Sequence, residues 1–425
     1  MENPAGRSAA DDRPIAVVLA GAGARGAYQA GALSVILPAL GAEQPRFYLG
    51  ASVGAINAVA CTSVSHLDPD DGTAKMLGMW RSVRRDDVFT WSLGAAVGQA
   101  LRRRGDGRPR SLLDSAPLNT TLERLFDWRQ FHANIAEERV WGCGVVGTAN
   151  STHSSTIFLE SRSSRRAPED DALRGVEFRP AKIAPVHVVA SSAIPAIFPA
   201  VRLADDRGAD WYVDGGVRLN TPIKPALTLG ARRVVVVATD PTRPAPPAGP
   251  DRPPGVGAGI VDLLRAVLVD PMVEDLRTLV SENRKAAKSG EPRTVEYLFA
   301  GPQRSDDLID VARSVLRSRR WYSPARRVAG SAELSRLGSY LLFDPEFIEG
   351  ALELGARDAS RHVGADGRIL WRTEQSPDDD PPGAAGTHHQ SERSRDRMEA
   401  DARYTSPRLA KIASPGSGAM PGGSV

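Results

Sequence analysis

A serine flanked by two glycines lies within residues 47–54, whose sequence is FYLGASVG. The apolar residues 47–49 predict a strand and the small residues from 55 onward predict a helix, with Ser52 at the junction. Gly50 and Gly54 allow the sharp turn that lifts a serine hydroxyl clear of the backbone. The pattern indicates a nucleophilic serine and acyl transfer. An ordinary strand-to-helix corner remains the alternative, because the chain is rich in glycine, alanine and serine.

A glycine-rich loop, GAGARG from Gly21 to Gly26, follows a predicted strand at 15–19 and precedes a predicted helix at 27–40. The loop fits the GxGxxG pattern of dinucleotide sites, which also require an acidic residue at the end of a second strand. Glu43 has about the right separation but lies in a predicted turn. Backbone N–H groups at a helix start can hold an oxyanion as well as a phosphate. We therefore assign the loop to an oxyanion hole and keep NAD(P) binding by an oxidoreductase as the alternative.

An aspartate enters a glycine turn at Asp214, within the run WYVDGG. An Asp-Gly hairpin is the simpler interpretation of this run, but a serine nucleophile needs a base. The histidines stand in uninformative settings. His362 could meet the chain order of an α/β-hydrolase, but nothing in its local sequence favours it. The chain has seven histidines: His66, His132, His153, His187, His362, His388 and His389. A Ser52–Asp214 pair avoids the need for a histidine, provided that the carboxylate comes within about 2.6–3.2 Å of the hydroxyl.

Together with residues 191–201, these segments resemble the patatin-like phospholipase family. That family combines a GGGx(R/K)G loop, a GxSxG elbow and a DG(A/G) aspartate in this order, with an ASxAxPxxFxP-like stretch between the last two. The resemblance covers about 15–240, and residues 339–347 are similar to a closing segment of bacterial members. It implies a three-layer α/β/α fold with a mainly parallel central sheet.

The resemblance also implies roles for individual residues. Ser52 corresponds to the nucleophile and Asp214 to its partner, and the reaction is hydrolysis of a lipid ester through an acyl-enzyme. A catalytically inactive scaffold with the same fold is a further alternative. The middle glycine of the family is Ala22 here, and its methyl group disfavours positive φ, so we expect it to contribute less than its neighbours. The other implied positions are the loop residues Gly21, Gly23, Arg25 and Gly26, the elbow residues Gly50 and Gly54, and the turn residues Gly215 and Gly216.

Composition sets limits on partners and location. The net charge of +3 over 425 residues implies no general affinity for nucleic acid. Cys61 and Cys143 are too few for a disulfide framework and are expected to be buried thiols. No residue cluster has metal-ligand spacing, and no cofactor is expected. We expect a cytoplasmic protein that acts on a lipid or acyl ester, either free or in peripheral contact with a membrane.

Strands alternate with helices along the chain, which favours a parallel sheet covered on both faces. Strands are predicted at 15–19, 47–51, 140–148, 156–159, 186–190, 211–213 and 234–239, and helices at 27–40, 55–65 and 118–125. Residues 140–146 and 234–237 are apolar at successive positions, as in strands buried on both faces.

The predicted organisation is a single domain at 14–373 between disordered ends at 1–13 and 374–425. The ends lack the apolar content needed to offset the entropy of ordering. Residues 68–110 form either a lid or insertion over the site or a helix packed on the body with a solvated basic end. Residues 255–373 are predicted to form a C-terminal helical part.

Overall fold

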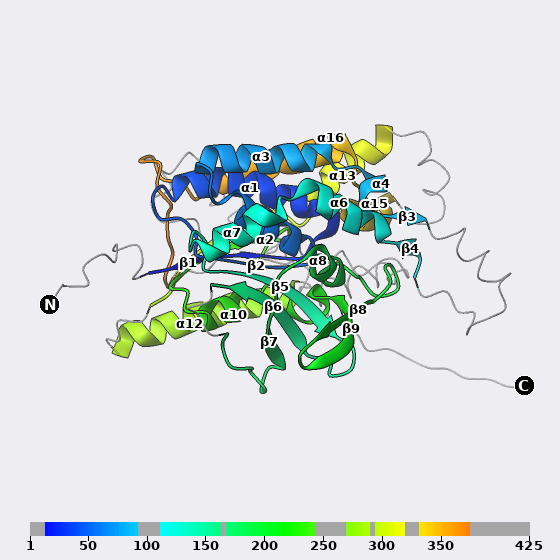
Figure 1. Ribbon diagram of the computed structural model, residues 1–425. Coiled ribbons are helices and arrows are strands. Elements are labelled where there is room, and N and C mark those ends of the chain that lie inside the picture. Colours follow the sequence, from blue (N-terminus) through cyan, green and yellow to red (C-terminus); the bar gives the residue numbers. More distant parts are fainter. Residues whose placement is uncertain are drawn as a thin grey trace, which may run out of the picture. The chain divides into compact units, whose positions relative to one another are not determined.

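The computed structural model describes a mixed sheet with helices on both of its faces (Figure 1). The described residues are 13–91, 111–162, 167–242, 269–289, 294–318 and 331–374. All of them belong to one compact unit, Met1–Pro382, and the second unit, Gly383–Val425, lies outside the described residues. The architecture confirms the predicted three-layer α/β/α fold.

The central sheet is nine-stranded and mainly parallel. Its strands are β1 (Ile15–Leu19), β2 (Phe47–Ala51), β5 (Gly142–Ala149), β6 (Ser155–Ser161), β7 (Val176–Pro180), β8 (Val201–Asp205), β9 (Gly208–Asp214), β10 (Arg233–Val237) and β11 (Glu296–Ala300). Their order is β11-β10-β1-β2-β5-β6-β7, with β9 paired to both β5 and β8. Only the pairs β5–β6, β5–β9 and β8–β9 of this sheet are antiparallel. A separate small sheet pairs β3 (Thr90–Trp91) with β4 (Leu113–Asp114).

Helices cover the two faces of the sheet. In Figure 1, α1, α3 and α16 lie above the sheet, whereas α10 and α12 lie below it. The helices are η2 (Gly23–Arg25), α1 (Gly26–Ala39), α2 (Val53–Val64), α3 (Pro69–Ser82), α4 (Arg85–Val88), α6 (Ala116–Leu125), α7 (Trp128–Ala136), α8 (Pro185–Ser191), α9 (Gly216–Leu219), α10 (Ile223–Thr228), α12 (Asp270–Ser289), α13 (Asp307–Ser318), α15 (Ser331–Leu341) and α16 (Pro345–Ser360).

Alternate residues of the strand β1 belong to two different apolar clusters, one on each face of the sheet. Val17 belongs to the same apolar cluster as Leu33 of α1, whereas its neighbour Val18 belongs to the cluster that contains Leu276 of α12. Successive side chains of a strand point to opposite faces, so a strand covered on both sides must be apolar at every position. All residues of β1 and β10 are buried, which confirms the prediction for 234–237.

One predicted strand is wrong. Residues 186–190 lie in the helix α8, and His187 is in its first turn rather than at the start of a strand. The β-branched valines favour a strand locally, but Pro185 stands at the first helical position, where its fixed φ and missing N–H cost nothing. The N–H of Ala184 donates to Nδ1 of His187 at 3.0 Å, which satisfies a donor at the helix start.

The prediction that 255–373 is a helical part is wrong at one place. The strand β11 lies inside this range and extends the sheet beyond β10, with Val235 opposite Leu298. A short apolar run such as EYLFA fits a buried strand or a helix equally well, and the pairing with β10 decides between them. Residues 255–268 lie outside the described residues.

The region 68–110 belongs in part to the body of the unit. The helix α3 packs against α1 and α16, and its Met76 and Trp80 are buried. The basic end on which both alternatives for this region depend lies within 92–110, outside the described residues, so the lid and the packed helix both stay predictions. The disorder predicted for 1–12 and 375–425 also falls outside the described residues.

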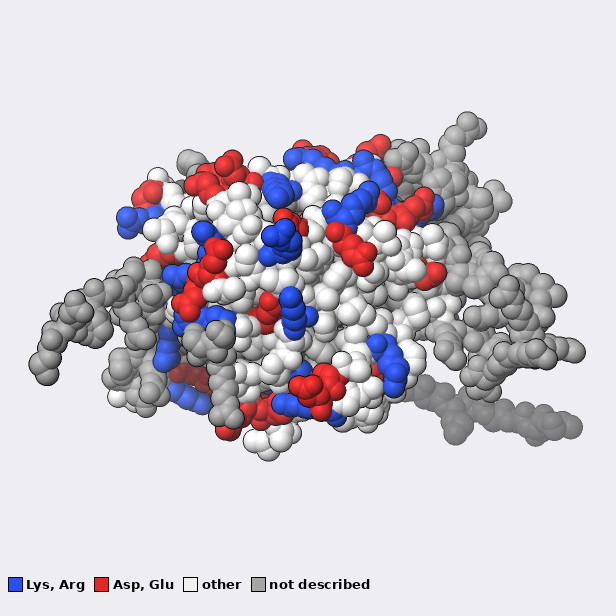
Figure 2. Space-filling model, viewed as in Figure 1, with Lys and Arg blue, Asp and Glu red and all other residues white. Residues whose placement is uncertain are grey.

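The face seen in Figure 2 carries acidic and basic side chains interspersed, without a large area of one sign. Ion pairs within the unit include Arg81 with Glu349 at 2.7 Å and Arg124 with Asp87 at 2.8 Å. Exposed pairs of this kind contribute little to stability. Within the described part of the chain, none of the helices combines the length and hydrophobicity needed to cross a bilayer.

Candidate active site

Ser52 occupies a strained turn between β2 and α2. Its φ is 54° and its ψ is −127°, a region that residues with a side chain rarely adopt. The flanking glycines are required by close backbone contacts: a Cβ on Gly50 would lie 2.2 Å from the carbonyl carbon of Gly54, and a Cβ on Gly54 would lie 2.2 Å from the carbonyl oxygen of Leu19. The turn therefore projects the Ser52 side chain from the carboxyl end of β2.

The strand β5 brings Asp214 to Ser52. The strand β2 runs parallel to β5 and ends with Ala51 opposite Val146. The strand β9 runs antiparallel to β5 and ends with Asp214 opposite Gly147, the next residue along. The carboxyl ends of β2 and β9 thus meet head to head, and the Ser52 hydroxyl lies near enough to lower the pKa of the Asp214 carboxyl.

The Asp214 carboxyl is buried, with 5% of its surface exposed. Burial raises its pKa to about 6, against the opposing effects of the Ser52 hydroxyl and the Gly216 N–H. That N–H donates to Oδ1 at 2.7 Å. No described residue makes a hydrogen bond of ordinary geometry to Oδ2. One carboxylate oxygen is thus fixed, and the other is available to accept a proton from Ser52.

The turn after Asp214 is not the Asp-Gly hairpin of the simpler interpretation. Gly215 and Gly216 lead into the helix α9, and the hairpin of this region lies earlier, between β8 and β9. A Cβ on Gly215 would lie 2.2 Å from the carbonyl oxygen of Val146. The glycine is therefore needed for the backbone of the aspartate turn to pack against β5.

The glycine-rich loop lies beside Ser52, since a Cβ on Gly21 would come 3.0 Å from the Ser52 Cβ. The N–H of Gly21 donates to Oδ1 of Asn220 at 2.9 Å, so Gly21 holds the loop in place rather than offering a free donor. Within the described residues, the N–H groups of Ala22 and Gly23 donate no hydrogen bond. These two amides are the donors that the glycine-rich loop leaves unpaired for an oxyanion.

The substitution of glycine by alanine at Ala22 meets no positive φ, because the φ of this residue is −162°. Its methyl group is buried in an apolar cluster with Tyr28, Val53 and Trp80. The penalty that a methyl group brings at positive φ therefore does not arise at this position. Positive φ occurs at the next residue, Gly23, at 56°.

Arg25 anchors the loop instead of pointing at the pocket. Its side chain is 3% exposed, and its Nε donates to Oγ of Ser339 at 2.9 Å. Its Nη1 lies 3.3 Å from Oδ1 of Asp240, and its guanidinium lies 4.0 Å from the centre of the Tyr340 ring. These contacts bind the start of α1 to α15 and to the end of β10. At the last loop position, Gly26, a Cβ would lie 2.3 Å from a methyl group of Val53.

Ser191 supports the elbow from α8. Its hydroxyl donates to the carbonyl of Val146 at 2.5 Å and accepts from the N–H of Ser52 at 2.8 Å. The side chain is fully buried. Ser191 therefore fixes the Ser52 backbone to β5, a role that the sequence pattern alone did not reveal.

Replacing Ser191 with alanine is expected to lower the free energy of unfolding by about 2–6 kcal/mol. The reason is that two buried backbone groups would each lose a partner, at about 1–3 kcal/mol apiece. Urea denaturation measures the loss. The matched control is Ser192→Ala, because the buried Ser192 Oγ has no hydrogen-bond partner among the described residues. Equal losses in both variants would contradict the bonding scheme.

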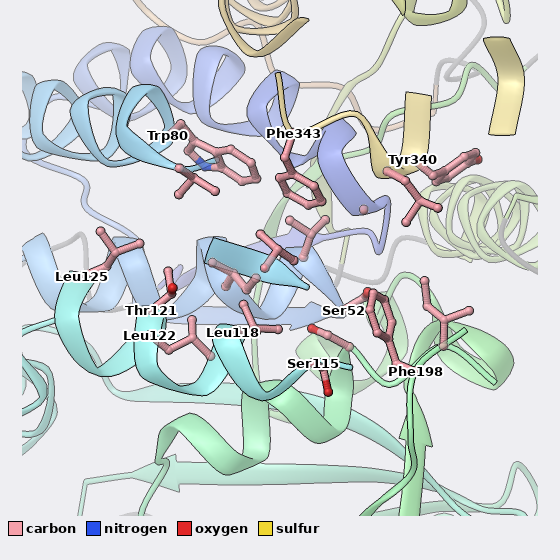
Figure 3. Close-up of a pocket in the computed structure, with 18 of the residues that line it drawn as sticks. Ser52, Trp80, Ser115, Leu118, Thr121, Leu122, Leu125, Phe198, Tyr340 and Phe343 are labelled. Carbon is pink, nitrogen blue, oxygen red and sulfur yellow. The ribbon is translucent and has the colours of Figure 1, made fainter. Parts of the chain in front are cut away.

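An apolar pocket opens beside Ser52 (Figure 3). Leu118, Leu122 and Leu125 of α6 form one wall, and Trp80 and Phe343 lie across from them. The cavity volume is about 60 Å³, so the pocket is narrow. Its lining is Gly23, Ser52, Val53, Ile56, Met79, Trp80, Val83, Val88, Ser115, Leu118, Thr121, Leu122, Leu125, Ser192, Ile194, Phe198, Tyr340, Leu341 and Phe343. Such a lining suits a hydrocarbon chain.

None of the described histidines lines this pocket. His187 packs against the ring of Phe158, and His362 is buried after α16, where burial lowers its pKa to about 3. His388 and His389 lie outside the described residues. The alternative of a histidine base therefore has no support from the arrangement of the site.

The dinucleotide alternative does not fit the strand order. Glu43 pairs with Arg233 at the amino end of β10, whereas the glycine-rich loop follows the carboxyl end of the parallel strand β1. The acidic residue therefore lies at the amino ends of the parallel strands, whereas the loop lies at their carboxyl ends. Within the part of the chain that the structure describes, no group of three or more His, Cys, Asp or Glu residues could hold a metal ion.

These features define a three-layer α/β/α protein with a serine at a strand-to-helix elbow, a buried aspartate next to it and an apolar pocket. Residues 17–227 match the family model described as patatin-like phospholipase, so this part of the chain is a patatin-like phospholipase domain. Such a domain implies lipid acyl hydrolase activity.

Among solved structures, VipD from Legionella pneumophila is similar at 12% identity and a TM-score of 0.28, over 92% of this chain and 74% of that chain. At these values the likeness carries no argument about function. No curated protein matches the chain.

Proposed function

We propose that the protein is a serine lipid acyl hydrolase in which Ser52 is the nucleophile and Asp214 its base. The observation that carries the proposal is the meeting of the ends of β2 and β9 on β5. It puts a strained serine next to a buried carboxyl whose Oδ2 has no partner among the described residues. The narrow apolar pocket beside Ser52 supports an acyl chain as the part of the substrate that is bound.

The proposed reaction has two halves. The Asp214 carboxylate takes the proton from Ser52 Oγ, which attacks the ester carbonyl carbon while the carbonyl electron pair moves to its oxygen. The N–H groups of Ala22 and Gly23 stabilise this oxyanion, an effect worth about 3–4 kcal/mol per strong donor in other hydrolases. The carbon–oxygen bond to the alcohol then breaks, and the proton on Asp214 passes to the leaving oxygen. In the second half, water gives a proton to Asp214 while its oxygen attacks the acyl carbon. The bond between that carbon and Ser52 Oγ then breaks, which releases the acid, and the proton on Asp214 passes to Ser52 Oγ to restore both residues.

Release of fatty acid from a panel of phospholipids, lysophospholipids, neutral glycerides and nitrophenyl esters tests the proposal. We expect saturable hydrolysis of at least one of these ester classes by the purified protein. A well-folded protein that hydrolyses none of them would favour the catalytically inactive scaffold.

The pH dependence follows from the state that Asp214 needs. A base must be ionised, and burial raises the pKa of Asp214 to about 6. We therefore expect kcat/KM to increase with pH and to reach half of its plateau near pH 6, since kcat/KM reports the free enzyme. A half-plateau near the ordinary aspartate value of about 4 would contradict this role. Circular dichroism over the same pH range separates titration from unfolding.

A further inference from the structure

A second cavity of about 90 Å³ adjoins the Ser52 pocket, and the two share Met79 and Leu125 in their linings. The second cavity is lined by Ala60, Ser63, Val64, His66, Lys75, Met76, Met79, Leu125, Phe126, Asp127 and Gln130. The shared side chains are both half-buried. Met79 and Leu125 therefore stand between the two spaces.

The helix α2 continues from one cavity into the other along one face. Ile56 lines the first cavity, whereas Ala60 and Val64 line the second. Residues four apart in a helix lie one above the other, so these three side chains follow a single stripe that leads away from Ser52. At about 1.5 Å per residue, the stripe from Ser52 to Val64 is about 18 Å long.

The helices opposite α2 repeat this order. Along α6, Leu118 and Leu122 line the first cavity, Leu125 lines both, and the following Phe126 lines only the second. Along α3 the chain runs the other way: Val83 lines the first cavity, Met79 lines both and Met76 lines the second. Residues of α2, α3 and α6 thus line both cavities in the same order. The side chains of Met79 and Leu125 lie between the two cavities and separate them.

The far end of the path differs in chemistry from the end at Ser52. Lys75 and Asp127 in the second cavity are exposed, and His66 is half-buried. Charged side chains at a cavity mouth remain hydrated, so the second cavity opens to water, whereas the first is apolar. A hydrocarbon chain bound at Ser52 would gain apolar contact as far as Met79 and Leu125.

We infer that Met79 and Leu125 close the end of the acyl-binding pocket and set the longest acyl chain that the enzyme binds fully. The inference rests on the proposed function and specifies the length of the acyl chain that the enzyme prefers. Removal of either side chain joins the two cavities and lengthens the acyl site. Methionine is unbranched and flexible, so Met79 is the more easily displaced of the two by a long chain.

The test compares Leu125→Ala with the wild-type protein on nitrophenyl esters of butyrate, octanoate, laurate and palmitate. We expect kcat/KM for palmitate relative to octanoate to rise about tenfold or more, since each added buried methylene is worth about fourfold. The matched control is Leu118→Ala, the same change on the same helix within the first cavity, which is expected to leave this ratio within about threefold of wild type.

Met79→Ala provides a second test from the opposite side of the path, and it keeps the inference falsifiable if Leu125→Ala does not fold. If the wild type hydrolyses the esters and folded Leu125→Ala and Met79→Ala keep the wild-type preference for chain length, this inference is overturned and the proposed function stands. Wild type that hydrolyses none of the esters would contradict the proposed function, and the inference with it.

Discussion

Replacing Ser52 with alanine is expected to lower kcat/KM for ester hydrolysis by at least about a thousandfold, because the attacking oxygen is lost. The fold should survive the change. The N–H of residue 52 would still donate to Ser191, and the positive φ of 54° is already present in the wild type. Hydrolysis by the two purified proteins, with urea denaturation alongside, measures both expectations. Turnover within about tenfold of wild type would show that another group attacks the ester.

Asp214→Asn is expected to lower kcat/KM by at least about a thousandfold and to make the protein more stable at neutral pH. Asparagine can still accept the Gly216 N–H, but it cannot take the proton from Ser52. The stabilisation has a separate cause, which is that burial opposes the ionised form of Asp214 and raises its pKa from 3.8 to about 6.

The sign of the stability effect follows from the two pKa values. At a pH below 3.8, the pKa of Asp214 in the unfolded chain, the carboxyl is protonated in both the folded and the unfolded protein. Asparagine then brings no advantage in stability. Above about pH 6 the folded wild type carries a buried carboxylate, which costs about 3 kcal/mol for a shift of about two units. We expect Asp214→Asn to exceed wild type by about that amount at pH 8 and by almost nothing near pH 3, below the unfolded pKa. An equal difference at both pH values would mean that ionisation of Asp214 is not the cause.

The sequence was sufficient for those parts of the site that depend on local backbone geometry. The turn at Ser52 and the loop from Gly21 to Gly26 each require small residues at fixed positions, and these requirements are visible in the order of the residues. The strand β10 was predictable for a similar reason, since both of its faces are apolar.

The sequence could not show which backbone donors are free. Gly21 and Gly23 look equivalent in the pattern, but the amide of Gly21 is used by Asn220, a residue that follows Asp214 and α9. The conformation of Ala22 was also hidden, because its φ depends on how the loop meets α15: a Cβ on Gly23 would lie 2.2 Å from the carbonyl oxygen of Tyr340. Such contacts join segments far apart in the chain.

Tertiary pairing decides the remaining features. The run VHVV at 186–189 has the composition of a strand, yet Pro185 and the place of α8 beside β5 make it a helix. The run EYLFA is a strand because β10 offers an edge for it to pair with. The pocket walls on α6 and α3 are apolar faces that the sequence cannot distinguish from ordinary core packing. The domain boundaries and the cytoplasmic location remain predictions.

The central claim is that Ser52 is a nucleophile activated by Asp214. The most direct measurement is the mass of the intact protein after incubation with a fluorophosphonate, followed by peptide mapping. We predict one adduct on Ser52 in the wild type, much slower labelling in Asp214→Asn and none in Ser52→Ala. An unlabelled wild type, or an adduct that persists in Ser52→Ala, would contradict the claim.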